Sequence, residues 1–397
     1  MQSVLISAYT AVTACGAGIE PLRETLLAQR SCLKPARLIR PDFLTFTGEV
    51  DMQLPEIGKA LKPYNARNAR IALAAIDCEG GVFRNAVDSA VERYGADRVG
   101  IIIGTSTSGI YETEQAYQAH ARSGAVPESF DFKHQHAWVA TAEFMKKELG
   151  LNGLCYAIST ACSSSGKAVA AGQRMLETGV CDAVVVGGVD SICHLTLYGF
   201  RSLELTSERP CTPLDRDRDG ISLGEGAGLL LLEREGESHM SLVGYGESSD
   251  AHHMTAPHPE GEGSALAMRA AMRTAGLSPD RIDYVNLHAT GTRLNDQSEM
   301  RAMASIFSPQ TLCSGTKGMT GHTLGAAGAV EAVITLIALE SGFAPGTCGI
   351  SHVDDEFGNH VLTAPVELPA MRTAMSNNFG FGGNNVSLIF SRRASDG

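Results

Sequence analysis

Aromatic residues are scarce in this chain of 397 residues: Phe, Trp and Tyr make up 6% of it, and only one tryptophan is present. Glycine is abundant, at 43 residues, and the hydrophobic fraction of 44% is ample for a large core. We therefore predict packing through small side chains and close backbone approach. By length alone, the chain could form two domains.

Signals for several protein classes are missing. No stretch approaches the ~20 apolar residues of a membrane span, and the N-terminal sequence lacks the basic region and apolar core of a signal peptide. The ten cysteines include no C-x-x-C pair, no Cys/His cluster has zinc-ligand spacing, and the pair His252-His253 stands alone. We expect a soluble, unprocessed, cytoplasmic protein without a metal or membrane contacts.

The acidic balance excludes another class, because a net charge of −12 argues against nucleic acid as the main partner. Nucleotide-binding loops are also not expected. The sequence has no G-x-x-x-x-G-K-[S/T] motif, and the glycine-rich stretches Gly224–Gly228 and Gly380–Gly383 each lead into a predicted strand instead of opening a helix.

Short apolar runs alternate with alanine-rich segments along the chain. The predicted buried strands include Val99–Ile103, Ala183–Val186, Leu229–Leu232 and Tyr284–Leu287. The predicted helices include Ala69–Asp77 and Ala265–Ala275. This alternation indicates α/β layers.

Two segments share one pattern and hint at an internal repeat. Cys155–Gly179 and Leu312–Gly342 each contain a strand, a polar turn, a helix of small residues and a glycine at the expected C-cap. The turn carries Cys162 in the first segment and His322 in the second. Similar α/β units also arise without duplication, so this pattern alone leaves the question open.

Cys162 lies between an apolar run, Leu154–Ile158, and a predicted helix, Gly166–Leu176. The start of a helix offers unpaired N–H groups and partial positive charge. We therefore expect a lowered thiol pKa and a nucleophilic thiolate. The alternative is a buried structural cysteine.

Three further motifs follow: His288-Ala-Thr-Gly-Thr292, the segment Lys317–Gly328 that contains His322, and the glycine-rich turn Phe379–Asn385. A cysteine with two distant histidines fits nucleophilic catalysis assembled across a fold. Each histidine alone could be a structural residue, but their combination favours catalysis.

The chain resembles elongating β-ketoacyl-[acyl-carrier-protein] synthases of the Cys-His-His type. The resemblance lies in four motifs and their order: Thr-Ala-Cys-Ser-Ser, His-Ala-Thr-Gly-Thr, Lys-x-x-x-Gly-His-x-x-Gly-Ala-Ala-Gly and Gly-Phe-Gly-Gly. The resemblance covers essentially the whole chain. It implies a thiolase-like α/β fold with five layers, α-β-α-β-α, built from two similar halves. We place the boundary within Glu235–Ser241, so that residues 1–238 carry the cysteine and residues 239–397 carry both histidines.

The resemblance also implies chemistry. Cys162 would accept an acyl chain, and His288 and His322 would hydrogen-bond the malonyl thioester carbonyl while carbon dioxide leaves. Backbone N–H groups of Cys162 and Phe381 would form the oxyanion hole, and Phe381 would gate the acyl pocket. The resemblance also implies that Lys317 and Glu331 form a pair near the active site. The alternative is that these two residues form an exposed ion pair at a helix end.

Substrate contacts follow from the same resemblance. Thr290 and Thr292 would bind the phosphopantetheine arm, Thr107 would lie at the floor of the acyl pocket, and Phe200 would lie near its mouth. Phe379 would line the site or simply pack in the core. No cofactor is expected beyond the phosphopantetheine of the carrier protein.

The implied partners are an acyl carrier protein and a second subunit, in a homodimer or a heterodimer. The predicted carrier-docking residues are basic: Lys59, Lys62, Arg67, Arg70 and Arg201. The alternative for this cluster is an ordinary solvated helix face.

Three departures from the family pattern leave the substrate open: Asn295 replaces a usual glycine, Asn384 replaces a usual threonine, and Phe200–Asp219 is short. Fatty-acid, polyketide and aryl-polyene elongation all fit, because some synthases of the aryl-polyene and polyketide pathways carry a comparable Leu-Asn-Asp variant. A heterodimer with a chain-length-factor-like partner is the alternative arrangement. A thiolase is disfavoured because no cysteine follows Cys348, and an initiating synthase because His322 fits the elongating pattern.

Overall fold

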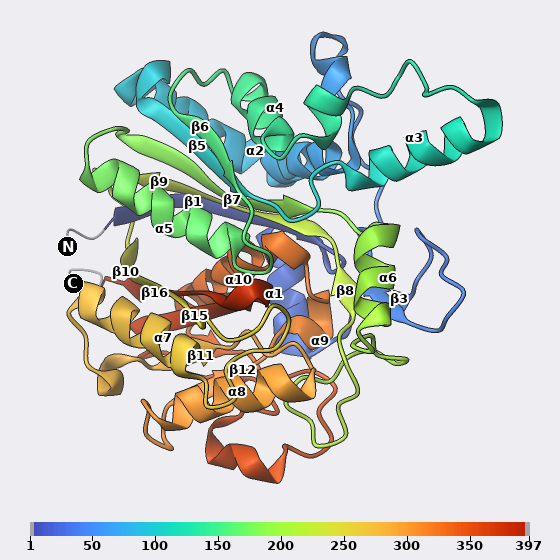
Figure 1. Ribbon diagram of the computed structural model, residues 1–397. Coiled ribbons are helices and arrows are strands. Elements are labelled where there is room, and N and C mark those ends of the chain that lie inside the picture. Colours follow the sequence, from blue (N-terminus) through green and yellow to red (C-terminus); the bar gives the residue numbers. More distant parts are fainter. Residues whose placement is uncertain (1–3, 394–397) are drawn as a thin grey trace.

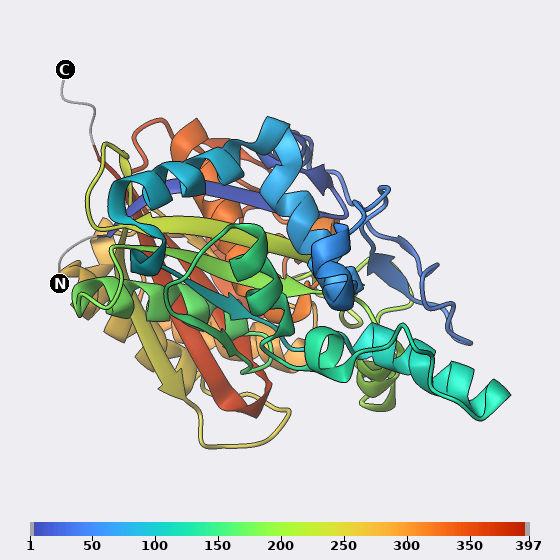
Figure 2. The ribbon, with the colours of Figure 1, turned by 90° about the horizontal axis from the view of Figure 1, so that it is seen from above.

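The computed structural model describes residues 4–393, with the backbone alone for residues 358–360. Figure 1 shows five layers, from helices α2 and α4, through a sheet, helices α5 and α10 and a second sheet, to helices α7 and α8. The predicted α-β-α-β-α architecture is therefore confirmed. Figure 2 shows the same stack from above, with helix α3 projecting at one side.

Within residues 4–393, each half of the fold contains a sheet of five main strands, and the two-residue strand β2 (Gly16–Ala17) also pairs with the end of β1. The N-terminal sheet contains, in spatial order, β6 (Cys155–Ile158), β5 (Val99–Gly104), β7 (Ala183–Asp190), β9 (Gly226–Glu233) and β1 (Val4–Thr13). The C-terminal sheet contains β12 (Leu312–Ser314), β11 (Tyr284–Asn286), β15 (Thr373–Gly380), β16 (Asn384–Arg392) and β10 (Met240–Ser249).

The two sheets have the same topology. Numbered within its own half, each has the strand order 3-2-4-5-1, with parallel pairs between strands 3, 2 and 4 and antiparallel pairs between strands 4, 5 and 1. The repeat inferred from the sequence is thus present in the fold. The sheets meet where β1 pairs with β10, at Val4 with Leu242 and Leu5 with Ser241. The predicted boundary falls between β9 and β10.

Helices complete the layers, and short elements connect them. The α-helices are α1 (Ile19–Ala28), α2 (Arg67–Tyr94), α3 (Ile110–Ser123), α4 (Ala140–Glu148), α5 (Ser164–Glu177), α6 (His194–Ser202), α7 (Glu262–Ala275), α8 (Arg293–Ala304), α9 (Lys317–Thr320) and α10 (Ala327–Ser341). The short helical turns are η1 (Lys59–Tyr64), η2 (Ala96–Arg98), η3 (Phe132–His136), η4 (Pro279–Arg281), η5 (Leu324–Ala326), η6 (Asp355–His360) and η7 (Phe381–Gly383). The short strands are β2 (Gly16–Ala17), β3 (Lys34–Pro35), β4 (Phe46–Gly48), β8 (Leu223–Gly224), β13 (Phe343–Ala344) and β14 (Val366–Glu367).

Helix α10 is the most apolar helix of the fold. The window Leu324–Ser341 has a mean hydropathy of 1.6, so by length and composition alone it could cross a membrane. This corrects the expectation that no such stretch exists. However, 89% of the window is buried inside the fold, because α10 lies between the two sheets. It is therefore the core helix that joins the halves.

The central helices approach each other through glycine. A Cβ atom added at Gly328 of α10 would lie 2.5 Å from the backbone nitrogen of Gly166 in α5, closer than real side chains allow. The same atom would lie 2.9 Å from Oδ1 of Asn378 on β15. Small residues thus bring the starts of both helices together, as the composition predicts.

We expect Gly328→Ala to destabilise the protein by at least ~2 kcal/mol, because backbone atoms cannot move away cheaply from the new methyl group. Gly199→Ala in α6 is the matched control, since nothing lies within 4 Å of its added Cβ. It should be neutral or slightly stabilising. Denaturant unfolding measures both, and equal stability of the two variants would contradict the close packing.

Candidate active site

Cys162 lies in a tight turn between β6 and α5. The turn is possible because Ala161 adopts a left-handed conformation, with φ of 53°. Ser164 stabilises it: its hydroxyl donates to the Ala161 carbonyl at 2.6 Å and accepts the Thr160 N–H at 2.9 Å. Gly380 at the end of β15 packs closely here, since an added Cβ would lie 3.2 Å from the Cys162 nitrogen. The thiol is thus held at the start of a buried helix.

His288 follows β11 and is held in place by a carboxylate that the sequence analysis did not identify. Glu299 of α8 accepts the backbone N–H groups of His288 at 2.9 Å and Ala289 at 2.8 Å. Burial raises the pKa of Glu299 to about 7, and these N–H groups oppose the rise. The available signal was spacing, because Asp296 and Glu299 are three residues apart and share a helix face.

Lys317 lies behind His288. Its ammonium contacts Nδ1 of His288 at 3.2 Å, the His288 carbonyl and the Glu331 carboxylate. An ammonium group can only donate, so Nδ1 of His288 must accept and Nε2 must carry the proton. The predicted pair of Lys317 and Glu331 is therefore buried, and it orients His288 instead of the neighbouring His322.

Glu331 gains a further partner that the sequence did not reveal. The side-chain amide of Asn378 donates to its carboxylate at 2.5 Å. Burial raises the pKa of Glu331 to about 7, while Lys317 and Asn378 act in the opposite direction. Asn378 lies on β15, far from Glu331 in sequence, and no local pattern connects the two residues.

His322 lies between α9 and η5 and is oriented by the backbone. The N–H of Leu324 donates to Nδ1 of His322 at 3.0 Å, so Nε2 carries the proton. Nε2 is buried and has no hydrogen-bond partner within residues 4–393. A buried donor without a partner is costly unless a ligand accepts it.

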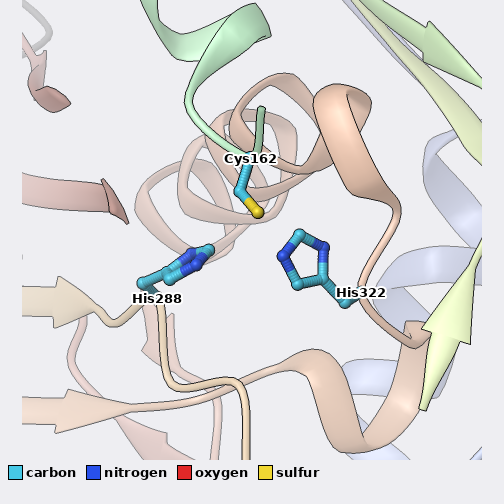
Figure 3. A group of neighbouring side chains, drawn as sticks. All are labelled: Cys162, His288 and His322. Carbon is cyan, nitrogen blue, oxygen red and sulfur yellow. The ribbon is translucent and has the colours of Figure 1, made fainter. Parts of the chain in front are cut away.

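The cysteine and the two histidines converge. The Sγ of Cys162 and one ring nitrogen of each histidine all lie within 4.8 Å of one another. The two imidazoles are 5.3 Å apart and nearly perpendicular, and Figure 3 shows both rings beside the sulfur. Such a group could hold a metal ion, but metal binding needs an unprotonated Nε2. The hydrogen bonds to both Nδ1 atoms therefore favour donation to a substrate oxygen.

Both histidines are neutral at pH 7. Burial lowers the pKa of His288 and of His322 well below 6.5, and the charge of Lys317 lowers both further. The site thus presents two uncharged, buried N–H donors, an arrangement suited to stabilising a developing oxyanion.

The thiol departs from expectation. Burial raises the pKa of Cys162 to about 11, although the backbone N–H groups of Phe381 and Cys162 and the charge of Lys317 oppose the rise. The helix terminus alone predicts a lowered pKa, but desolvation outweighs it here because Cys162 is only 7% exposed.

A cavity opens beside the thiol and contains most of the predicted substrate contacts. Its lining includes Cys162, His288, His322, Phe200, Thr290, Thr292, Asn295, Phe379 and Phe381. The rings of Phe200 and Phe381 lie 5.4 Å apart at one wall. The hydroxyls of Thr290 and Thr292 lie 2.9 Å apart. Phe379 therefore faces the site as well as the core.

Thr107 does not line this cavity. Its side chain is fully buried, and its hydroxyl donates to Asp190 at 2.7 Å. The expectation that Thr107 forms the floor of the acyl pocket is therefore corrected, because hydrogen bonding turns the side chain toward β7.

The predicted docking cluster divides into two groups. Arg67 forms a bidentate ion pair with the buried Glu225, and Arg70 donates to the carbonyls of Pro55 and Leu54. The Arg67 guanidinium is therefore not free for a partner, which corrects the expectation for Arg67, whereas the half-buried Arg70 lies beside Lys59 and Lys62. Lys59 and Lys62 are exposed on η1.

Arg201 also stays accessible, with 42% of its side chain exposed. Its guanidinium lies 3.7 Å from Glu208 and 5.0 Å from the centre of the Phe43 ring. The structure therefore leaves Lys59, Lys62, Arg70 and Arg201 as candidate docking residues.

Comparison with known proteins identifies the family. The model of the beta-ketoacyl synthase N-terminal domain matches residues 1–238, and that of the C-terminal domain matches residues 239–351. The chain belongs to the beta-ketoacyl synthase family. The resemblance inferred from the motifs is thus confirmed, and with it the reaction class: the protein is a condensing acyltransferase, a ketosynthase.

Relatives of this ketosynthase match it along nearly its full length. A 3-oxoacyl-[acyl-carrier-protein] synthase 2 from Coxiella burnetii is 32% identical, over 98% of this chain and 99% of the relative. Among solved structures, the ketosynthase ApeO in complex with its chain length factor ApeC, from Xenorhabdus doucetiae, is 38% identical with a TM-score of 0.92 and covers 98% of both chains. The ishigamide ketosynthase/chain length factor is 27% identical with a TM-score of 0.89, over 99% of this chain and 100% of that one.

The raised pKa of Cys162 predicts how its alkylation depends on pH. Because the thiol stays protonated until about pH 11, the thiolate fraction should rise about tenfold per pH unit between pH 7 and 9. The rate of iodoacetamide alkylation at Cys162, followed by intact mass with peptide mapping, should rise equally. A plateau below pH 8 would mean that the two histidines and the backbone donors outweigh burial.

Proposed function

We propose that this ketosynthase elongates a carrier-bound acyl chain, with Cys162 as the nucleophile. The acyl group transfers from its thioester to Sγ, and the thiol of the carrier arm leaves. The backbone N–H groups of Cys162 and Phe381 act on the sulfur. They would also receive the oxyanion that forms on the acyl carbonyl during this transfer.

His288 and His322 would bind the second substrate, a malonyl thioester. As its carboxylate leaves as carbon dioxide, negative charge develops on the thioester oxygen, between the two Nε2–H donors. Each such donor is typically worth about 3–4 kcal/mol in the transition state. The resulting carbanion attacks the acyl group on Cys162 and releases the sulfur. The orphaned Nε2 of His322, buried with no partner in residues 4–393, is the observation that carries this assignment.

Lys317 and Glu331 would act through His288 and not on the substrate. Lys317 fixes the tautomer of His288, and Glu331 balances the lysine charge within the core. Thr290 and Thr292, at the cavity wall, would hydrogen-bond the phosphopantetheine arm, and the Phe381 ring would move against Phe200 to admit the acyl chain. No other cofactor is required, and we place the reaction in the cytoplasm.

For the assembly we favour a heterodimer with a related subunit of the chain-length-factor type. Two similar solved structures, at TM-scores of 0.92 and 0.89, are of ketosynthases with chain length factors. Strand β6 is the free edge of the N-terminal sheet and could pair with a partner strand. Exposed aromatic side chains lie on helix α3, which projects from the fold (Figure 2), and on the segment that follows it. They are Tyr117, Phe132 and Trp138.

The acyl chain that this ketosynthase elongates is unsaturated or aryl-primed and belongs to a polyene or polyketide pathway. Asn295, in the unusual Leu-Asn-Asp sequence, lines the cavity itself and donates to Asp296 at 3.2 Å. The second departure, Asn384, lies between Gly383 and Asn385, which both line the cavity, and it accepts from Lys167 at 3.1 Å. A saturated fatty-acid chain is the other candidate, because a similar full-length relative is a 3-oxoacyl-[acyl-carrier-protein] synthase 2.

The heterodimer can be tested with a partner subunit that has the ketosynthase fold but lacks the nucleophilic cysteine. Co-expressed with this chain, it should form a 1:1 complex by light scattering and condense carrier-bound substrates. Phe132→Asp with Trp138→Asp should break the complex, whereas the exposed control Leu266→Asp on α7 should not. A fully active homodimer of this chain alone would overturn the proposed assembly.

The proposed docking of the carrier protein at Lys59 and Lys62 can be tested by reversing their charge. Lys59→Glu with Lys62→Glu should raise the apparent KM for malonyl-carrier protein about fivefold to tenfold at low salt, because an acidic carrier is attracted by exposed lysines. Malonyl-pantetheine has no protein to dock, so its KM should stay unchanged. Arg273→Glu, an exposed site on α7, serves as control. Equal losses on both substrates would mean that η1 supports the fold.

A further inference from the structure

Asp190, at the end of β7, has a fully buried carboxylate that the chemistry above does not use. It accepts seven hydrogen bonds. Thr105 donates its hydroxyl, while Ser106 and Thr107 each donate a backbone N–H and a hydroxyl, at 2.5–3.1 Å, with the Ser106 N–H shared between both oxygens. The backbone N–H of Gly325 completes the shell at 2.6 Å.

Gly325 connects this carboxylate to the active site. It follows Leu324, whose N–H donates to Nδ1 of His322 and whose backbone is left-handed, with φ of 56°. The turn fits tightly, because an added Cβ at Gly325 would lie 2.7 Å from Oδ2 of Asp190 and 2.6 Å from the Ser106 nitrogen. A non-glycine residue with positive φ is strained, so an external contact must hold the turn.

The contacts of Asp190 require a carboxylate. Every partner is a donor, and no lysine or arginine lies within 4.0 Å of it among residues 4–393. An amide in its place would direct its own N–H groups at one set of these donors. Asparagine has nearly the same shape, so Asp190→Asn replaces one of the two acceptor oxygens with a donor and removes the charge without creating a cavity.

We propose that Asp190 is a positioning residue for His322: it anchors the Leu324-Gly325 turn, and the turn keeps Nδ1 of His322 accepting and Nε2 protonated toward the substrate. The inference rests on the ketosynthase reaction alone, not on the partner subunit or the carrier. Loss of the anchor should therefore impair decarboxylation of the malonyl group, which needs the Nε2–H of His322. It should spare the nucleophile Cys162.

The primary experiment compares two reactions that need neither carrier nor partner. Decarboxylation of malonyl-pantetheine is measured in a Cys162→Gln background, where no acyl transfer occurs. Addition of Asp190→Asn should slow it about 30-fold, the usual range for a residue that orients a catalytic group. Alkylation of Cys162 by iodoacetamide, measured with the native cysteine, should stay within about threefold.

A double-mutant cycle separates positioning from general damage. If Asp190 acts through His322, Asp190→Asn should add no further loss to His322→Ala, whereas independent effects would multiply. Asp182→Asn is the matched control, because Asp182 immediately precedes β7 and pairs with Arg98 and Arg234. It should leave both reactions unchanged.

A tautomer measurement decides the case even if a variant folds poorly. In protein labelled with ¹⁵N-histidine, the His322 ring should show protonated Nε2, and Asp190→Asn should shift it toward a tautomer mixture. Ser106→Ala, which removes a hydroxyl that contacts both Asp190 and Gly325, should move the signal in the same direction. An unchanged His322 signal, or multiplicative losses in the cycle, would overturn the proposal.

Discussion

The contact between helices α5 and α10 is the constraint on which the site depends. The nucleophile belongs to the N-terminal half and both histidines to the C-terminal half, so catalysis needs the helix starts of the two halves side by side. Gly166 and Gly328 allow this approach, because a methyl group at Gly328 would overlap the facing backbone. A second contact joins them nearby, where the Ala329 N–H donates to Ser165 at 2.9 Å. The duplicated fold is thus also the means of assembling the site.

Burial then determines the electrostatics. The site encloses Lys317 and the carboxylates Glu299 and Glu331 with almost no exposed surface, and each charge is matched by a partner or by N–H donors. The same burial keeps the histidines neutral and the Cys162 thiol protonated. A protonated thiol fits an enzyme that accepts its acyl group from an activated thioester, since the proton can leave during transfer instead of before it.

Motifs predicted the fold and the members of the site, but they did not predict contacts between distant segments. Cys162, His288 and His322 could be selected because each sits in a distinctive local sequence. Asn378 could not, since its relation to Glu331 exists only after β15 and α10 pack together. For Arg67, the sequence predicted a contact that the fold does not allow. Its charge and its helix position favoured an exposed docking residue, and only the folded structure shows that it pairs with Glu225. The pKa of Cys162 was misjudged because burial is a property of the whole structure.

The two histidines reach the same tautomer by different means. His288 relies on a lysine side chain, whereas His322 relies on a backbone N–H in a strained turn. A side chain can adjust its rotamer, but a left-handed turn holds its geometry only while something outside it is fixed. Asp190 supplies that fixed point from β7, a central strand with neighbours on both sides. Because Asp190 also binds Thr107 in the loop before α3, the geometry of His322 is connected to that loop as well as to β7.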